Sequence, residues 1–109
     1  MNSKDNTYNG WPNYETWLVA LHLDNEQVSY HDCQRMAIEA ADEAQHYTSK
    51  DEASRHMLAI ALQTYVEGLQ PEYLKGVYAD LITHALGSVD WRSLAEHYLE
   101  KLSDVKQTR

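Results

Sequence analysis

The side chains best suited to bind a metal ion lie between residues 31 and 46. Asp42 and His46 are four residues apart, so a helix would place both on one face. His31 and Cys33 lie further upstream, and zinc sites usually need three or four such ligands at defined spacing. Neither an H-E-x-x-H pattern nor a C-x-x-C pair occurs in the chain. The sequence therefore predicts no metal site and no cofactor.

Nucleophilic catalysis is the second chemistry that the residue types suggest. Cys33 is the only cysteine, and it belongs to a stripe of Ala and Met positions where cysteine behaves as a small buried hydrophobe. The chain has no serine in a G-x-S-x-G turn and no glycine-rich phosphate loop. Adjacent acids such as Asp42 and Glu43 project to different sides of a helix. We predict no catalytic residues and expect that the chain is not an enzyme.

Carboxylates are the remaining chemical feature. Residues 1–72 contain twelve acids and four bases, a net charge of −8, whereas residues 73–109 contain five of each and are neutral. Many of the acids fall between the segments expected to form the first and third helices. The partner-binding residues predicted on this acidic face are Glu39, Asp42, Glu43, Asp51 and Glu52. In the alternative interpretation, these side chains form only a solvated surface.

The sign of this charge indicates the kind of partner. Direct nucleic-acid binding requires clustered Lys and Arg, and an excess of acids argues against it. A surface of carboxylates can instead imitate nucleic-acid phosphates and occupy the basic cleft of a nucleic-acid enzyme. The predicted partner is therefore a protein with a basic nucleic-acid-binding surface.

Aromatic side chains offer a second binding mode. The chain has eight Tyr and three Trp, residues that suit half-buried positions and contact surfaces. In one interpretation, Trp11 folds back on the first helix as a hydrophobic staple and Trp17 enters the core. In the other, Trp11, Tyr14 and Trp17 line a pocket with Glu15 as its polar contact. The residues predicted to bind a partner in an aromatic contact are Tyr8, Trp11, Tyr14 and Tyr73.

Two blocks of the chain resemble a known family. The first block, residues 9–17, reads Asn-Gly-Trp-Pro-Asn-Tyr-Glu-Thr-Trp. It resembles the N-terminal N-G-W-x-N-Y-E-T-W motif of a family of small proteins of phages and mobile elements. The Leu-Val-Ala-Leu-His-Leu-Asp-Asn-Glu that follows is also similar to that family, as is a second block, residues 89–97, Val-Asp-Trp-Arg-Ser-Leu-Ala-Glu-His. The resemblance implies a small helical domain of mobile-element origin, and it implies no activity, substrate or catalytic residue.

Helices are the elements that must position these side chains. Gly and Pro are scarce, and five segments show the spacing of amphipathic helices: residues 14–23, 30–47, 50–69, 71–86 and 91–102. Capping boxes are expected at Ser29 and Asp32 and at Ser49 and Glu52. The fold predicted from these segments is an all-α, compact bundle of about five short helices. Its expected parts are an irregular arm (1–12), a single helical domain (13–103) and a polar tail (104–109).

The apolar stripes of these helices predict the core. The long central helix at 50–69 has its main stripe at Ala53, Met57, Ile60, Ala61, Tyr65 and Leu69, widened by Leu58, Leu62 and Val66. Across the whole chain, the residues expected to be buried are Trp17, Leu21, Met57, Ile60, Leu81, Leu94 and Leu99.

Composition also limits the compartment. A single cysteine allows no intramolecular disulfide, and no apolar run approaches the roughly 20 residues that a membrane span needs. The N-terminal residues are polar and resemble no signal peptide. We therefore expect a cytoplasmic protein without contact to a membrane, and the mobile-element resemblance implies that the cytoplasm is that of a bacterial host.

These observations lead to one functional hypothesis and one alternative. A mobile element has reason to carry an inhibitor of host defence, either CRISPR or restriction, and this step rests on analogy. The hypothesis is a small acidic protein that inhibits a host nucleic-acid-targeting defence complex by occupying its basic surface. The alternative is a self-associating helical accessory or regulatory protein that has no nucleic-acid enzyme as its target.

Overall fold

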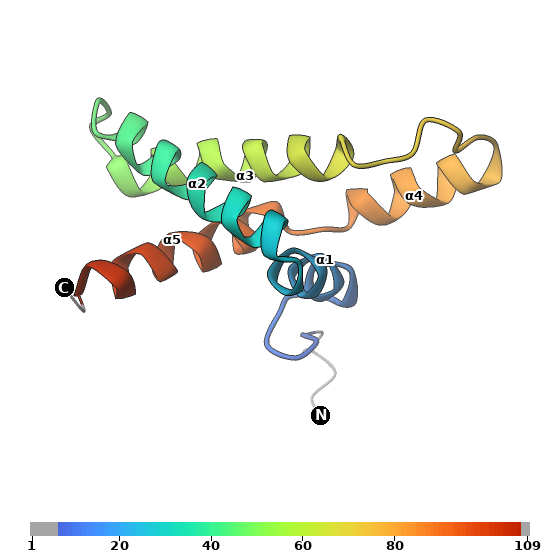
Figure 1. Ribbon diagram of the computed structural model, residues 1–109, viewed down its shortest axis with the longest axis horizontal. Helices are drawn as coiled ribbons and strands as arrows, with labels where there is room; N and C mark the ends of the chain where they lie inside the picture. Colours follow the sequence, from blue (N-terminus) through green and yellow to red (C-terminus); the bar gives the residue numbers. More distant parts are fainter. Residues whose placement is uncertain (1–6, 108–109) are drawn as a thin grey trace.

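Five helices make up most of residues 7–107, the part of the chain that the computed structural model describes (Figure 1). Of residues 103–107 only the backbone is described. The helices are α1 (Tyr14–Asn25), α2 (Gln27–Ala44), α3 (Lys50–Glu67), α4 (Val77–Gly87) and α5 (Trp91–Gln107). The described residues contain no strand, only an isolated bridge between Tyr8 and Trp11. The prediction of an all-α fold with about five helices is confirmed.

The core lies where α2, α3 and α5 pack against one another, with α1 against α2 and α5. α2 contributes small side chains, which allow its two neighbours to approach closely: Cys33, Ala37, Ala40 and Ala44. α3 and α5 contribute large ones that fill the space between the helices: Leu58, Leu62, Leu94 and Tyr98. The apolar stripe of each of these helices is thereby covered by side chains of a neighbouring helix.

The buried face of α3 differs from the predicted one. Its fully buried residues are Leu58 and Leu62, which we expected only at the edge of the stripe. Ile60, expected near the centre, is 52% exposed. The buried face also includes Ser54, whose hydroxyl donates to the Asp51 carbonyl oxygen at 3.0 Å. Because a polar residue lies on the buried face of α3, the pattern of apolar residues did not show which face is buried.

Two predicted capping boxes do not form. α2 begins at Gln27, earlier than predicted, so Ser29 lies inside the helix. There its buried hydroxyl donates to the Leu23 carbonyl oxygen at 2.9 Å and joins α2 to the end of α1. Ser49 does precede α3, but its side chain makes no capping hydrogen bond. Ser29 therefore makes a contact between helices in place of a cap, and Ser49 makes no capping bond.

The fourth helix is shorter than predicted and it is poorly covered. It was expected from residue 71, but α4 begins at Val77, directly after Gly76. Gly76 has a φ of 62°, a conformation that breaks helical continuity and favours glycine. α4 has no buried residue, and Leu81, predicted for the core, is 59% exposed.

The predicted core is therefore only partly correct. Leu94 is fully buried, whereas Trp17, Met57 and Leu99 are half-buried. Leu21, Ile60 and Leu81 are exposed, which corrects the prediction for those three residues.

At the ends of the described part of the chain lie a tight turn and a last helix that is longer than predicted. Residues 7–12 contain an ordered turn, which is described below. α5 continues to Gln107, five residues past the predicted end at 102, so the backbone of 104–107 is helical. Residues 1–6 and 108–109 of the predicted arm and tail lie outside the described part of the chain. Within that part, no helix has an apolar run long enough to cross a membrane.

Candidate functional site

The predicted acidic face divides between two helices. Glu39, Asp42 and Glu43 lie on α2, outside the stripe of buried alanines that faces the core. All three side chains are exposed. Asp51 and Glu52 lie in the first turn of α3, where acidic residues also favour the helix dipole. The structure therefore exposes the predicted carboxylates around the turn that joins α2 to α3.

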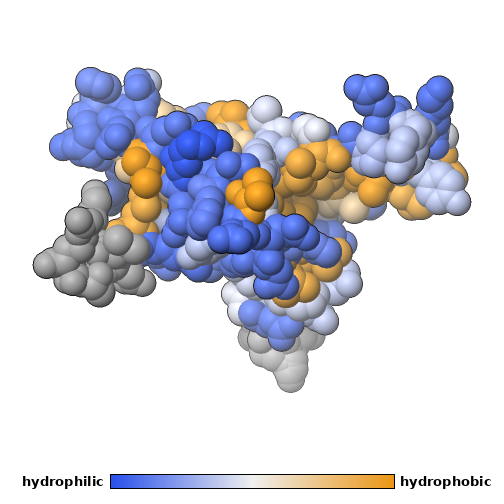
Figure 2. Space-filling model, in the orientation of Figure 1, coloured by the Kyte–Doolittle hydropathy of each residue, from blue (hydrophilic) through white to orange (hydrophobic). Residues whose placement is uncertain are grey.

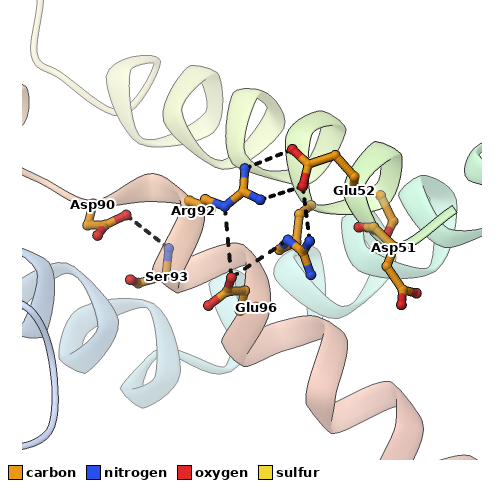
Figure 3. Close-up of polar contacts among 8 residues, drawn as sticks. Asp51, Glu52, Asp90, Arg92, Ser93 and Glu96 are labelled. Atoms are coloured by element: carbon orange, nitrogen blue, oxygen red, sulfur yellow. Dashed lines mark hydrogen bonds and ion pairs between the residues drawn. The ribbon is translucent and has the colours of Figure 1, made fainter. Parts of the chain in front are cut away.

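Glu52 differs from the other four because two arginines bind it (Figure 3). Arg92 of α5 donates to both carboxylate oxygens, at 2.5 and 3.0 Å, and Arg55 of α3 donates at 3.0 Å. Glu96, one turn after Arg92, lies 3.6 Å from Arg55 Nε and 3.9 Å from Arg92 Nε. These four side chains carry two charges of each sign. The network joins α3 to α5 without adding net charge to the surface.

This network makes the titration of Glu52 a direct test of the geometry. Hydrogen bonds from Arg92, and then from Arg55, lower the pKa of Glu52 to about 2. A carboxylate whose folded pKa is lowered stabilises the fold above its ordinary pKa, and that stabilisation is lost as pH falls toward 2. In an NMR titration of side-chain carboxyl carbons, Arg92→Gln should raise the pKa of Glu52.

Arg35→Gln provides the matched control, because Arg35 pairs with Asp32 and Glu39 on α2. It should leave the pKa of Glu52 unchanged. An ordinary carboxyl pKa for Glu52 in the unaltered protein would show that the arginines do not bind it in solution.

Three of the predicted acids have no counter-charge among the side chains that the structure describes. Asp42, Glu43 and Asp51 form no ion pair with any side chain that the structure describes. Asp51 points away from the arginine network in Figure 3 and lines a hollow of about 700 Å³ between α2, α3 and α5. We call these three residues the unpaired acidic surface. It is the strongest uncompensated charge among the residues predicted to bind a partner.

The predicted aromatic residues lie in three places. Tyr8 packs against Tyr14 and Trp17, with ring centroids 5.1 and 4.9 Å apart. Trp11 instead contacts His97 of α5, at 5.0 Å between ring centroids. Tyr73 lies in the loop before α4 and is 80% exposed. Trp11 lines a small hollow beside His97, and neither Tyr14 nor Trp17 belongs to the lining of that hollow.

A tight turn separates Tyr8 from Trp11. The two residues exchange backbone hydrogen bonds of 2.7 and 2.8 Å across Asn9 and Gly10. Asn9 and Gly10 have φ angles of 48° and 88°, as a two-residue type I′ turn requires. The Asn-Gly pair in the first block thus sends Tyr8 back toward α1 and Trp11 toward α5.

The first and second blocks meet in space. The Asn13 side chain caps α1 by accepting from the Thr16 amide at 2.9 Å, and its Nδ2 donates to the Ser88 carbonyl oxygen at 2.7 Å. The Thr16 hydroxyl accepts from the Asp90 amide at 2.8 Å and donates to Asn13 Oδ1 at 2.6 Å. Thr16 is completely buried. These contacts give Asn13 and Thr16 a structural role in joining α1 to the start of α5.

A partly buried polar group between α1 and α5 was missed by the sequence interpretation. Asp24 accepts from the Tyr98 hydroxyl at 2.6 Å, and its other oxygen is 3.2 Å from His97 Nε2. An Asp–His pair can act as a general base when a substrate reaches the imidazole. Here His97 borders a small hollow of about 270 Å³ beside Trp11. Because Asp24 and His97 lie 73 positions apart, no local spacing in the sequence could have paired them.

The neighbouring titratable groups are held neutral. Burial raises the pKa of the Cys33 thiol to about 11, and burial likewise raises the pKa of Tyr98. Desolvation raises the pKa of Tyr65 to about 12, and its hydroxyl donates to Asp32 at 2.8 Å. A neutral, fully buried thiol is a poor nucleophile, so Cys33 contributes to packing.

The residues considered as metal ligands point in different directions. Cys33 is buried in the core, whereas His31 and His46 are exposed. Among the described residues, no three His, Cys, Asp or Glu side chains are grouped in a way that could hold a metal ion.

The chain belongs to the DUF7249 family, a family of unknown function, whose model matches residues 4–80. The match includes the first block, α1, α2 and α3, and it ends within α4. Comparisons with curated proteins and with solved structures found no match.

Proposed function

We propose that the protein acts by binding, and that its partner is a host protein with a basic nucleic-acid-binding surface. The observation that carries the proposal is the unpaired acidic surface: Asp42, Glu43 and Asp51 are exposed and lack a described counter-charge. Like charges on neighbouring helices raise the local potential, and a basic cleft would relieve it. Glu39 extends this surface along α2, although it shares Arg35 with Asp32.

The proposed consequence of binding is inhibition of a nucleic-acid-targeting defence complex. Carboxylates spaced along helices can occupy positions that phosphates would otherwise take in a basic cleft. The net charge of −8 supports a protein partner over direct contact with nucleic acid. The mobile-element resemblance of the first block supports anti-CRISPR or anti-restriction activity in the host cytoplasm, and this step is an analogy. The proposal assigns no catalytic residue, cofactor or metal to the chain.

Glu52 has a different role in this proposal from the one predicted. Its carboxylate already accepts three hydrogen bonds from Arg55 and Arg92, so a partner's arginine would have to displace them. We therefore expect Glu52 to position α3 against α5. The contact with the partner would fall on the unpaired acidic surface.

Charge reversal tests the proposal once affinity purification from host cells has supplied the partner. Asp42→Lys combined with Glu43→Lys should slow association at low salt by about 10- to 100-fold, because attraction between opposite charges accelerates encounter. Added salt should weaken binding of the unaltered protein, since the Debye length is only about 10 Å at 0.1 M. Nucleic acid should compete for the same site on the partner. Stopped-flow or biosensor kinetics would measure all three effects.

The matched control reverses two acids outside the proposed surface. Glu67→Lys with Glu72→Lys makes the same change in net charge, and both residues are exposed. Exposed substitutions usually change stability by no more than about 0.5 kcal/mol, so both variants should fold. If both double variants slow association equally, the change in net charge alone explains the effect. If binding does not change with salt and the Asp42→Lys, Glu43→Lys variant still binds normally, the proposal is contradicted. That result would favour an aromatic contact through Tyr8, Trp11, Tyr14 or Tyr73.

A further inference from the structure

Exposed hydrophobic side chains gather on α4 and on the loop that leads into it. Hydrophobic side chains follow one another there, all more than half exposed: Leu69 61%, Tyr73 80%, Val77 64%, Tyr78 66% and Leu81 59%. We call these five residues the α4 surface. In Figure 2, hydrophobic colour gathers where Figure 1 places α4 and the C-terminal half of α3. No described residue of α4 is buried, although Leu86 near its end is partly buried against the core, and the closely packed helix pairs lie among the other four helices.

An uncovered α4 conflicts with the energetics of helices in water. The helix has 11 residues, and isolated helices shorter than about 12–15 residues are marginal without tertiary packing. Its apolar residues keep helical spacing, because Val77 and Leu81 are four positions apart and Tyr78 is three before Leu81. The helix therefore needs a cover whenever the protein is folded. A second copy of the chain is the one partner present wherever the chain is made.

We propose that the α4 surface is the interface of a symmetric homodimer, in which each copy covers the α4 of the other. With residue surfaces of roughly 150–230 Å², the five side chains expose about 600 Å² in each copy. Complete coverage of both surfaces would bury about 1,200 Å² in total, before half-buried neighbours such as Leu74 and Ile82 are counted. Stable interfaces bury about 1,200–2,000 Å² in total, so the α4 surface is large enough.

Charge also favours a second copy at this face. Two chains of net charge −8 repel each other, unless they meet where the charge is balanced. Residues 69–81, which contain the α4 surface, carry two acids and one base, a net charge of only −1. In a symmetric pair each residue of the face meets the same face of the other copy. A nearly neutral, apolar face satisfies that condition better than the acidic face on α2 does.

Solution mass tests the proposal with the full chain. The chain has a mass of 12.6 kDa, and light scattering after size exclusion should give twice that mass at micromolar concentrations. Val77→Asp with Leu81→Asp should return the protein to a monomer and raise the dimer Kd about 100-fold or more, as expected for charges placed in an apolar interface. Because Val77 and Leu81 are 64% and 59% exposed within their own chain, this variant should keep the circular dichroism of a folded bundle.

The matched control places the same charges on another exposed apolar pair. Val28 and Ile38 of α2 are also exposed, and Val28, like Val77, lies in the first turn of its helix. Val28→Asp with Ile38→Asp should leave the dimer intact. Hydrogen exchange gives a second measurement, because α4 amides of the unaltered protein should gain protection as protein concentration rises.

Three outcomes would overturn the proposal. If the protein stays monomeric across the micromolar range, a second copy of the chain does not cover α4. A dimer that survives the Val77 and Leu81 substitutions, or that the Val28 and Ile38 substitutions break equally, is built on another surface. Concentration-independent exchange of the α4 amides shows that no second copy covers the helix.

Discussion

Replacing Leu62 with alanine is expected to lower the free energy of unfolding by about 2–5 kcal/mol, the range for truncating a buried leucine. Leu62 is completely buried on α3, within the main hydrophobic core. The loss combines the transfer energy of the removed methyl groups with the cavity left among rigid neighbours. Ile60→Ala, two residues earlier on the same helix, should cost less than about 1 kcal/mol because Ile60 is half-exposed. Urea denaturation followed by circular dichroism measures both values.

The pair of variants locates the buried face of α3. Equal losses at Leu62 and Ile60, or a larger loss at Ile60, would mean that the stripe predicted through Ile60 faces the core after all. Leu58→Ala gives an independent check, since Leu58 lies one turn before Leu62 and is also fully buried. It should match Leu62→Ala rather than Ile60→Ala.

The helices themselves could be predicted because their signals are local. Asn13 caps α1 and Asp90 accepts from the Ser93 amide at the start of α5, as capping residues do. Stripes with a period near 3.6 residues located all five helical segments. Boundaries were less certain where the decisive residue acts through an unusual conformation. Gly76 is such a residue, because its positive φ delays the start of α4.

Which face of a helix is buried depends on its neighbours. α3 has apolar residues on more than one side, and its buried Ser54 bonds to a carbonyl oxygen within the helix. Nothing in the sequence of α3 shows that Leu58 and Leu62 meet α2 and α5 while Ile60 does not. α4 presents the same problem in a stronger form, because its stripe shows only that a face requires a cover. Periodicity does not say whether the same chain supplies it.

The candidate site shows the same limit for charge. The acidic excess of the first 72 residues could be counted from the sequence, and the exposed positions on α2 follow from helical spacing. The pairing of Glu52 with Arg92 spans 40 positions and depends on how α3 crosses α5. The hydrogen bond between Asp24 and Tyr98 spans 74 positions. Long-range pairs of this kind decide which carboxylates stay unpaired, so composition alone overstated the acidic face.

Thr16→Val should be the most informative change in the first block, with an expected loss of about 1–3 kcal/mol in the free energy of unfolding. The two side chains have nearly the same shape, so packing changes little. The valine cannot accept the hydrogen bond from the Asp90 amide or donate to Asn13, so the Asp90 amide loses this bond, whereas Asn13 Oδ1 keeps the bond from the residue 16 amide. Leaving a polar group unsatisfied in a buried place costs more than the average net value of a hydrogen bond. Thermal and urea unfolding would measure the loss.

Two further variants separate the hydroxyl group from the rest of the side chain. Thr16→Ser keeps the hydroxyl and should retain most of the stability that Thr16→Val loses. Thr83→Val makes the same change on the exposed surface of α4, where it should alter stability by no more than about 0.5 kcal/mol. If Thr16→Val proves as mild as Thr83→Val, the bond between the two blocks is not what holds α1 against α5. The N-G-W-x-N-Y-E-T-W pattern would then need another explanation, and its exposed Tyr14 would become the first residue to test in partner binding.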